Sequence, residues 1–270
     1  MQVSRIWLVP VLALCSLAIG SSAQASDADA ASAHGKEVHW GYAGDAGPAA
    51  WGGLSAEYKA CADGRSQSPV DLPAVEDSQP ATAGLNPADL ETHPERHPSD
   101  VVNNGHTIQV NFAGGSSLAV GAERFELLQL HFHAPSEHTV AGRELPMEVH
   151  FVHRSDAGVL AVVGVLIAEG QANSAYAPIW EKLPAEADAH ASLAALTLDV
   201  DVLLPKRRSA LRYTGSLTTP PCSEGVRWLV LAEPVELSAE QIAAFTALYD
   251  DNNRPTQPLH GRSLVLEELK

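Results

Sequence analysis

Basic residues are scarce in this sequence of 270 residues: 17 Lys and Arg stand against 33 Asp and Glu, and the formal net charge at pH 7 is −16. Nucleic acids and anionic membrane surfaces attract basic proteins, so this balance argues against both as partners. A solvated acidic surface is its simplest interpretation. The charge places no restriction on a small-molecule substrate.

Long apolar runs are also lacking, with one exception at the N-terminus. Residues 6–20 are predominantly apolar, follow Arg5 and precede Ala23-Gln24-Ala25, a small-x-small pattern typical of signal-peptide cleavage. This run is shorter than the about 20 residues that a membrane-spanning helix needs. We therefore predict that residues 1–25 are a secretory signal, that the protein is exported to the periplasm or secreted, and that it has no membrane partner.

Cysteine is rare as well, with three residues in the whole sequence. Cys15 lies within the predicted signal, where Leu14 is bulkier than a lipoprotein site requires, so lipidation is the weaker alternative there. After cleavage Cys61 and Cys222 remain, and they allow one intramolecular pair. Export favours oxidation of this pair to a disulfide, whereas two buried free thiols are the alternative.

The rest of the chain shows no linker, no internal repeat and no low-complexity segment. Residues 26–36 are rich in Ala, Ser and Asp and read as a flexible lead-in. Residues 37–270 read as one mainly β (α+β) domain with short peripheral helices. The predicted strands are 107–112, 118–120, 125–133, 146–153, 160–168, 211–216 and 227–231. The predicted helices are 238–249, with a capping box of Ser238 and Gln241, and more weakly 175–182 and 187–196.

Three histidines form the most informative pattern. His131 and His133 lie two residues apart in one predicted strand, and His150 lies in the next. Side chains alternate along a strand, so His131 and His133 point to the same face. If the strand of His150 lies beside them, three imidazoles converge. Three nitrogen ligands with an open fourth position are the catalytic arrangement of Zn²⁺, so we predict one Zn²⁺ per chain.

Two polar residues are placed to support these ligands. Gln129 and Glu148 each lie two residues before one of the histidines, on the same strand face. A metal-bound histidine needs an acceptor for its other ring nitrogen, and we predict that Gln129 and Glu148 supply it. Val152 follows on this face as an apolar wall, whereas His153 points to the opposite face and is excluded.

A His-x-His pair alone is a weak zinc signal, because most strand histidines are core or surface residues and the chain has 12 histidines. His93 and His97 are four residues apart, yet Pro94 and Pro98 argue against a regular helix. We expect both in a surface loop over residues 86–100.

The segment Leu130-His131-Phe132-His133-Ala134-Pro135-Ser136-Glu137-His138-Thr139-Val140 resembles the zinc motif of the α-class carbonic anhydrases in their shorter bacterial form. Further motifs match the family in order over nearly the whole mature chain. They are His39-Trp40-Gly41-Tyr42, Gln67-Ser68-Pro69-Val70, Asn103-Asn104-Gly105-His106, Glu148-Val149-His150-Phe151-Val152-His153, Tyr213-Thr214-Gly215-Ser216-Leu217-Thr218-Thr219-Pro220-Pro221-Cys222 and Asn253-Arg254-Pro255-Thr256-Gln257-Pro258-Leu259.

The resemblance implies a catalytic domain over 37–270 with a central, largely antiparallel, twisted β-sheet of about ten strands. It implies reversible hydration of CO₂ to bicarbonate and a proton, through attack by zinc-bound hydroxide, with weak esterase activity as a side reaction. The implied ligands are His131, His133 and His150. Glu137 and Thr218 correspond to the pair that orients the hydroxide, and His106 corresponds to the proton shuttle.

The same resemblance implies the remaining site residues. Val152, Val162, Leu217 and Trp228 match the apolar wall of the substrate pocket, and Thr218 and Thr219 line the same pocket. Cys61 and Cys222 match a disulfide of bacterial members. A homodimer is a further expectation from bacterial relatives, although the sequence identifies no interface.

Two other functions compete with catalysis. A non-catalytic binding module on the same fold would ordinarily lack a zinc ligand, and here all three are present. A zinc-storage protein would not need Glu137, Thr218 or His106.

Overall fold

The computed structural model describes residues 38–78, 88–91, 98–113, 116–195 and 198–269. The predicted signal peptide, residues 1–25, and the lead-in, residues 26–36, lie outside them. The description below refers to the described residues. None of their helices is long and apolar enough to cross a membrane.

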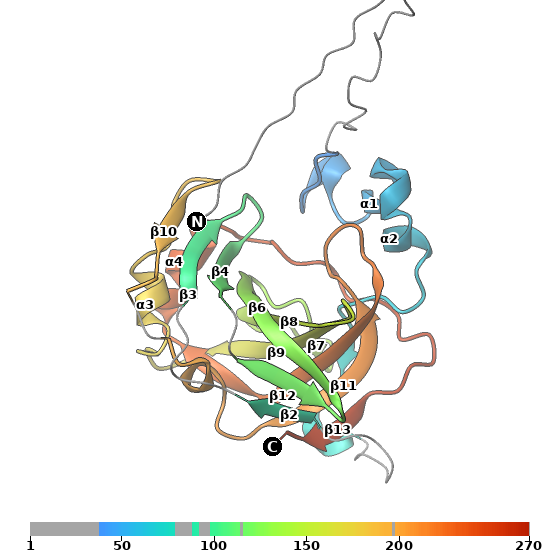
Figure 1. Ribbon diagram of the computed structural model, residues 1–270. Helices are drawn as coiled ribbons and strands as arrows, with labels where there is room; N and C mark the ends of the chain where they lie inside the picture. The colour runs from blue at the N-terminus through green and yellow to red at the C-terminus, as the bar shows by residue number, and fades with distance from the viewer. Residues whose placement is uncertain (1–37, 79–87, 92–97, 114–115, 196–197, 270) are drawn as a thin grey trace, which may run out of the picture. The chain divides into compact units, whose positions relative to one another are not determined.

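Among the described residues, eleven strands form one sheet, and its main path runs β10-β3-β4-β6-β8-β9-β12-β11-β13 (Figure 1). β5 pairs with β6 and with β2 beside this path. Neighbouring strands are antiparallel except β9 and β12, so the predicted, largely antiparallel sheet is confirmed. The strands are β2 (Ala88–Glu91), β3 (Pro98–Asn103), β4 (Ile108–Phe112), β5 (Ser117–Val120), β6 (Glu123–His133), β8 (Met147–Ser155), β9 (Leu160–Glu169), β10 (His190–Ser192), β11 (Ser209–Ser216), β12 (Glu224–Leu237) and β13 (Val265–Glu268).

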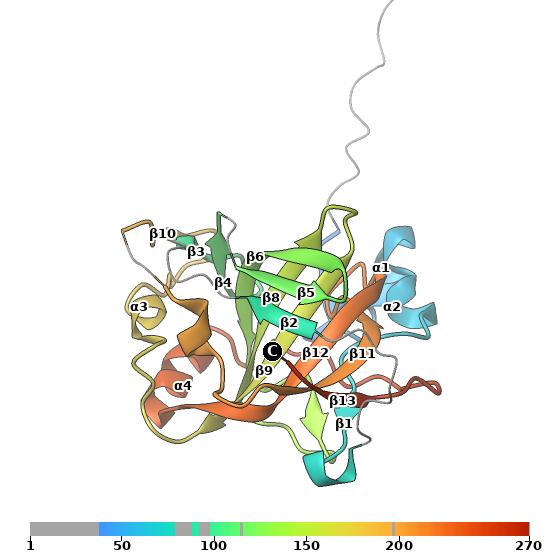
Figure 2. The same ribbon diagram turned by 60° about the horizontal axis from the view of Figure 1, so that its bottom comes forward.

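The short elements surround this sheet. β1 (Asp71–Leu72) and β7 (Thr139–Val140) form a separate parallel pair. The α-helices are α1 (Trp51–Leu54), α2 (Ala60–Asp63), α3 (Ala177–Trp180) and α4 (Ala239–Thr246). The 3₁₀ helices are η1 (Gly44–Ala46), η2 (Ala56–Tyr58), η3 (Val75–Asp77) and η4 (Val200–Leu203). Both views show α3 and α4 on the side of β3 and β10, away from α1 and α2 (Figures 1 and 2).

The two faces of the central strands carry different side chains. On β8, Val149 and Phe151 join the larger apolar cluster, into which Ile179 of α3 and Phe245 of α4 also pack. The alternate residues of β8 face the other way, where a smaller apolar cluster contains Val162 and Trp228. Alternation along the strand therefore separates an apolar core from the face that carries the histidines.

The helix after Ser238 begins as predicted. The Ser238 hydroxyl accepts a hydrogen bond from the Gln241 backbone N–H, and the Gln241 side chain accepts one from the Ser238 N–H, which completes the capping box. The helix ends at Thr246, earlier than the predicted Tyr249.

Two local predictions were wrong. Residues 187–196 were more weakly expected to be helical, but β10 forms there and pairs antiparallel with β3. Residues 86–100 were expected to be a loop, but they contain β2 and the start of β3. In both places backbone pairing within the sheet outweighs local propensity. His93 and His97 lie outside the described residues.

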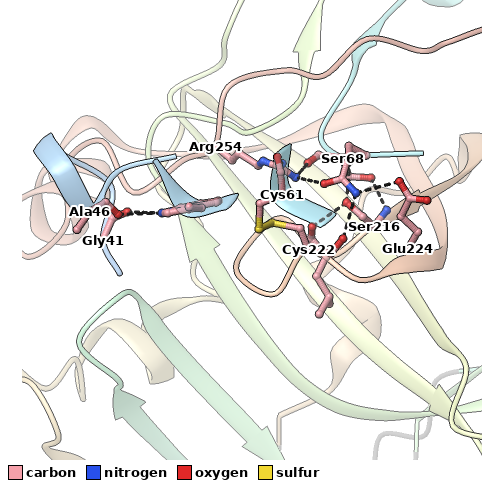
Figure 3. Close-up of a disulfide and its surroundings, with 11 residues drawn as sticks. Gly41, Ala46, Cys61, Ser68, Ser216, Cys222, Glu224 and Arg254 are labelled. Carbon is pink, nitrogen blue, oxygen red and sulfur yellow. Dashed lines mark hydrogen bonds between the residues drawn. A yellow bond between two sulfur atoms is a disulfide. The ribbon is translucent and has the colours of Figure 1, made fainter. Parts of the chain in front are cut away.

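A disulfide joins Cys61 of α2 to Cys222, which are 161 residues apart in sequence (Figure 3). The buried Arg254 side chain reinforces this junction. Its Nη2 donates to the Cys61 carbonyl oxygen (3.0 Å), and its Nη1 donates to Gln67 Oε1 and the Ser68 carbonyl oxygen (both 2.8 Å). Gln67 Nε2 in turn donates to the Cys222 carbonyl oxygen (3.1 Å). The N-terminal helices are therefore fastened to the loop that follows β11.

Removing this cross-link should destabilise the protein. A double variant, Cys61→Ser with Cys222→Ser, frees a long loop in the unfolded state and should lower the free energy of unfolding by about 2–5 kcal/mol. Urea unfolding of the oxidised wild type and the variant measures this difference. Reductant should lower the stability of the wild type and leave the double variant unchanged. Two free thiols in the native oxidised protein would contradict the disulfide.

His153 should make the protein sensitive to acid. It is 1% exposed on β8, and its Nδ1 donates to the Phe151 carbonyl oxygen (2.8 Å). Burial lowers the pKa of His153 to about 4, against the effect of two backbone carbonyls, whereas its ordinary value is 6.5. As the pH falls from 6.5 to 4, the unfolded chain gains this proton before the folded chain. The free energy of unfolding should therefore fall by about 3 kcal/mol across this window on account of His153.

A His153→Gln variant isolates this contribution, because the other histidines titrate in both proteins. Urea unfolding between pH 4 and 7.5 should show a shallower loss of stability in the variant. Equal pH dependence in the two proteins would show that His153 does not carry the effect.

Candidate metal centre and active site

The register between β6 and β8 brings the three predicted histidines together. His131 lies directly opposite His150, and His133 lies opposite Glu148. The three imidazole centroids are 4.7–5.2 Å apart. One ring nitrogen from each histidine lies within 4.8 Å of the others. His133 and His150 are each 1% exposed, while His131 keeps partial contact with solvent.

Each histidine has an oxygen partner for its second ring nitrogen. Gln129 Oε1 lies 2.9 Å from His131 Nδ1, and Glu148 Oε1 lies 2.8 Å from His150 Nε2. Both predicted supporting residues therefore contact the neighbouring histidine. The third partner is the backbone carbonyl oxygen of Asn252, 2.7 Å from His133 Nδ1. These bonds leave His131 Nε2, His133 Nε2 and His150 Nδ1 without their protons and available as ligands.

Asn252 is a site residue that the sequence did not identify. It immediately precedes the Asn253-Arg254-Pro255 motif, which is the one signal near it. Its side chain accepts from the Ala134 N–H (2.8 Å) and donates to the carbonyl oxygens of Phe132 (3.0 Å) and His106 (3.1 Å). Asn252 thus connects the end of β6 to the turn that carries His106.

The free nitrogens fit a zinc ion. His133 Nε2 is buried and has no hydrogen-bond partner among the described residues, which is unusual for a polar atom unless a further ligand binds it. Burial lowers the pKa of all three imidazoles, that of His133 to about 4, so they are neutral at ordinary pH, as zinc ligands must be.

A second cluster, His138 with Glu148 and His150, also brings three ligand atoms within 4.8 Å. Its atoms are already committed to hydrogen bonds, because Glu148 Oε1 lies 2.7 Å from His138 Nδ1 and 2.8 Å from His150 Nε2. This cluster supports the first one and is not itself a metal site.

Glu137 lies directly beside the histidines. It is 1% exposed, and its Oε2 is 3.6 Å from His133 Nε2 and 3.9 Å from His150 Nδ1. Its Oε1 accepts from the Arg254 backbone N–H (2.9 Å). Burial raises the pKa of Glu137 to about 7, while His150, a hydrogen bond from the Thr218 side chain and the Arg254 N–H act in the opposite direction. The structure thus brings the predicted pair Glu137 and Thr218 into contact.

The predicted apolar residues gather on the same face of the sheet. Val162 and Trp228 belong to the smaller cluster, and Val152 and Leu217 pack against it while half-buried. The Trp228 ring lies 4.8 Å from the His150 ring, centroid to centroid. Thr219, next to the 5% exposed Thr218, is also half-buried.

His106 follows a tight turn. The Asn104 side chain accepts from the backbone N–H groups of His106 (3.0 Å) and Thr107 (2.9 Å), which fixes the turn. The half-buried His106 ring stacks on Trp40 at 3.8 Å between centroids. Burial, and then the nearby His39, lower the pKa of His106.

Comparison with known proteins identifies the family. The family model of the eukaryotic-type carbonic anhydrases matches residues 46–268. A carbonic anhydrase from Pectobacterium carotovorum is 43% identical over 229 residues, which are 84% of this chain and 91% of that protein. One from Nostoc sp. is 42% identical over 239 residues, or 88% of this chain and 89% of that protein.

A solved structure agrees with these relatives. The α-carbonic anhydrase of Thermovibrio ammonificans, determined with the inhibitor sulfanilamide, is 45% identical and superposes with a TM-score of 0.79. The match covers 85% of this chain and all of that chain. The chain therefore belongs to the α-class carbonic anhydrase family of enzymes.

Proposed function

We propose that this protein catalyses the reversible hydration of carbon dioxide to bicarbonate and a proton, with one Zn²⁺ per chain bound by His131, His133 and His150. The observation that carries the proposal is the set of three ring nitrogens within 4.8 Å of one another, each on a histidine whose other ring nitrogen has an oxygen partner. When bound by three histidines, Zn²⁺ is a Lewis acid that lowers the pKa of a water ligand from about 15.7 to about 7, a value that comes from carbonic anhydrase itself.

Glu137 and Thr218 would orient the nucleophile. An ionised carboxylate only accepts hydrogen bonds, so the Thr218 hydroxyl must donate to Glu137. The Thr218 oxygen then remains free to accept a hydrogen bond from the O–H group of the nucleophile. This hydrogen bond orients the nucleophile so that one of its lone pairs points toward the carbon of CO₂. A cation beside Glu137 favours its ionised form, as this role requires.

The apolar side chains would hold the substrate. CO₂ carries no charge, so it gains little from polar partners and favours a pocket from which water is excluded. Val152, Val162, Leu217 and Trp228 offer such a wall beside the histidines. Thr219 and the Thr218 backbone N–H would contact the polar oxygens of the bicarbonate product.

The same arrangement supports two further parts of the proposal. A nucleophilic oxygen held in this way also attacks activated esters, so weak esterase activity is expected. The disulfide between Cys61 and Cys222 favours an oxidising compartment, which supports export to the periplasm or beyond. A binding module or a zinc-storage protein would have no use for a buried Glu137 in contact with Thr218.

Hydration of CO₂ in a stopped-flow instrument tests the proposal. The zinc-loaded wild type should bind one Zn²⁺ per chain and accelerate hydration, whereas His133→Ala should lose both zinc and activity because the site keeps two ligands. His153→Gln is the matched control, since His153 is an equally buried histidine on the opposite face of β8. It should retain zinc and activity. Wild-type hydration no faster than that of His133→Ala would reject the enzyme proposal.

His106 should carry the proton out of the site. Proton recombination is limited to about 10¹⁰ M⁻¹s⁻¹, so a group of pKa about 7 releases its proton to water at about 10³ s⁻¹. That is far below the about 10⁶ s⁻¹ reached by carbonic anhydrase. His106→Ala in dilute buffer should therefore lower kcat toward this limit and leave kcat/KM unchanged. Imidazole buffer should restore kcat.

His190→Ala provides the control for this experiment, because His190 is an exposed histidine on the edge strand β10. Its kcat should equal that of the wild type. A His106→Ala enzyme with wild-type kcat in dilute buffer would show that another route carries the proton.

A further inference from the structure

A chain of buried hydrogen bonds leads from His150 away from the zinc site. Glu148 Oε1 contacts His150 Nε2 (2.8 Å) and His138 Nδ1 (2.7 Å). His138 Nε2 contacts the Tyr213 hydroxyl (2.7 Å), and this hydroxyl contacts Ser68 Oγ (2.9 Å). None of the five side chains belongs to a residue more than 4% exposed.

The hydrogen positions at the outer end follow by elimination. Ser68 Oγ accepts from the Ser216 backbone N–H (3.1 Å). Among the described residues, its own hydrogen has one acceptor within reach, the Tyr213 oxygen. Ser68 therefore donates to Tyr213. The Tyr213 hydrogen is then directed to His138 Nε2, which must be an unprotonated acceptor.

The contacts of Glu148, at the inner end of the chain, indicate the same direction of donation. Glu148 Oε2 accepts from the backbone N–H groups of Glu137 (2.9 Å) and His138 (2.8 Å), and Oε1 faces the two imidazoles. A carboxylate in this position acts as an acceptor for four donors. His138 therefore carries its hydrogen on Nδ1 and His150 carries its hydrogen on Nε2. Every hydrogen between Ser68 and Glu148 points toward Glu148.

Two glycines make room for this chain. A Cβ atom at Gly215 would lie 2.0 Å from Ser68 Oγ and 2.8 Å from the Tyr213 ring. A Cβ atom at Gly164, which pairs with His150 across the sheet, would lie 3.1 Å from Glu148 Oε1. Larger residues at these positions would displace the polar groups, so the packing is fitted to the hydrogen bonds at both ends.

We propose that Ser68, Tyr213 and His138 are positioning residues for the metal ligand His150. They hold His138 in the tautomer that donates to Glu148, and Glu148 then keeps the proton of His150 on Nε2 and its Nδ1 lone pair directed to zinc. The other His138 tautomer would place a lone pair 2.7 Å from the Glu148 carboxylate and repel it. This inference rests on the proposed zinc site. If it holds, the wild type releases zinc more slowly than variants that lack these hydrogen bonds.

The outer end of the chain is anchored near the disulfide. The Ser68 carbonyl oxygen accepts from Arg254 Nη1, and the Ser68 N–H donates to Ser216 Oγ (2.9 Å). Figure 3 shows Ser68 and Ser216 close to Arg254 and to the sulfurs of Cys61 and Cys222. The position of Ser68 is thus set by several strong contacts and does not depend on Tyr213.

Zinc dissociation from the holoenzyme into excess chelator tests the proposal. Tyr213→Phe removes the donor to His138 and keeps the ring, and it should release zinc faster by a few-fold to about tenfold, at the lower end of the effect of outer metal partners. Tyr176→Phe is the matched control. Tyr176 is also fully buried, and its hydroxyl donates to the Leu203 carbonyl oxygen (2.8 Å) within the larger apolar cluster. It should release zinc at the wild-type rate.

Two further measurements separate positioning from general destabilisation. Ser68→Ala keeps the Tyr213 hydroxyl but removes the hydrogen bond that Ser68 donates to it. This variant should also accelerate zinc release, by less than Tyr213→Phe does. Imidazole ¹⁵N spectra of the zinc-loaded protein should show His138 protonated on Nδ1, with its Nε2 resonance changed in Tyr213→Phe and unchanged in Tyr176→Phe.

The outcomes distinguish this proposal from the proposed function. A wild type that binds no zinc would overturn the zinc site itself. A wild type that binds one zinc, with Tyr213→Phe releasing it at the wild-type rate or no faster than Tyr176→Phe, would overturn the positioning role alone.

Discussion

The buried carboxylate of Glu148 is the group on which the geometry of the site depends. It is 0% exposed, and such a charge is costly unless it is fully hydrogen bonded. Burial alone would raise its pKa, but attraction and hydrogen bonds from His138 and His150 leave the pKa well below its ordinary value. The four donors that surround it come from Glu137, His138 and His150. One carboxylate therefore contacts the imidazoles of His138 and His150 and the backbone N–H groups of Glu137 and His138, and it fixes their positions relative to one another.

The register of β6 and β8 is the second constraint. A shift of one residue in either strand would move its histidines to the opposite face of the sheet. The larger apolar cluster lies on that face, and its burial of Val149 and Phe151 opposes such a shift. The larger apolar cluster thus specifies which side chains of β6 and β8 lie on the face that carries the three histidines.

Period-2 alternation explains what could be predicted from the sequence. It placed His131, His133 and His150 with Gln129 and Glu148 on one face, and excluded His153, because each inference needs only the spacing within a strand. Asn252 could not be found in this way, since it contributes a backbone carbonyl whose direction the sequence does not show. The strand β10 was missed because its stability comes from pairing with β3, far away in the chain. The link from Glu148 through His138 and Tyr213 to Ser68 requires four segments to meet, and no local pattern indicates it.

Arg254 contacts both the N-terminal helices and Glu137, the carboxylate beside the three histidines. It is 2% exposed, and among the described residues its guanidinium forms no ion pair with a carboxylate within 4 Å. Backbone carbonyls, the Gln67 amide and the Trp51 ring, 5.7 Å from the guanidinium carbon, solvate it instead.

Burial lowers the pKa of Arg254 to about 10, and attraction to Glu137 opposes this change. Attraction between two charges is mutual, so the cation that holds Cys61 and Ser68 in place also favours the ionised form of Glu137. That is the form in which Glu137 accepts the hydrogen bond of the Thr218 hydroxyl. The hydrogen bonds that hold the N-terminal helices and the ionisation of Glu137 are therefore linked through one buried side chain, Arg254.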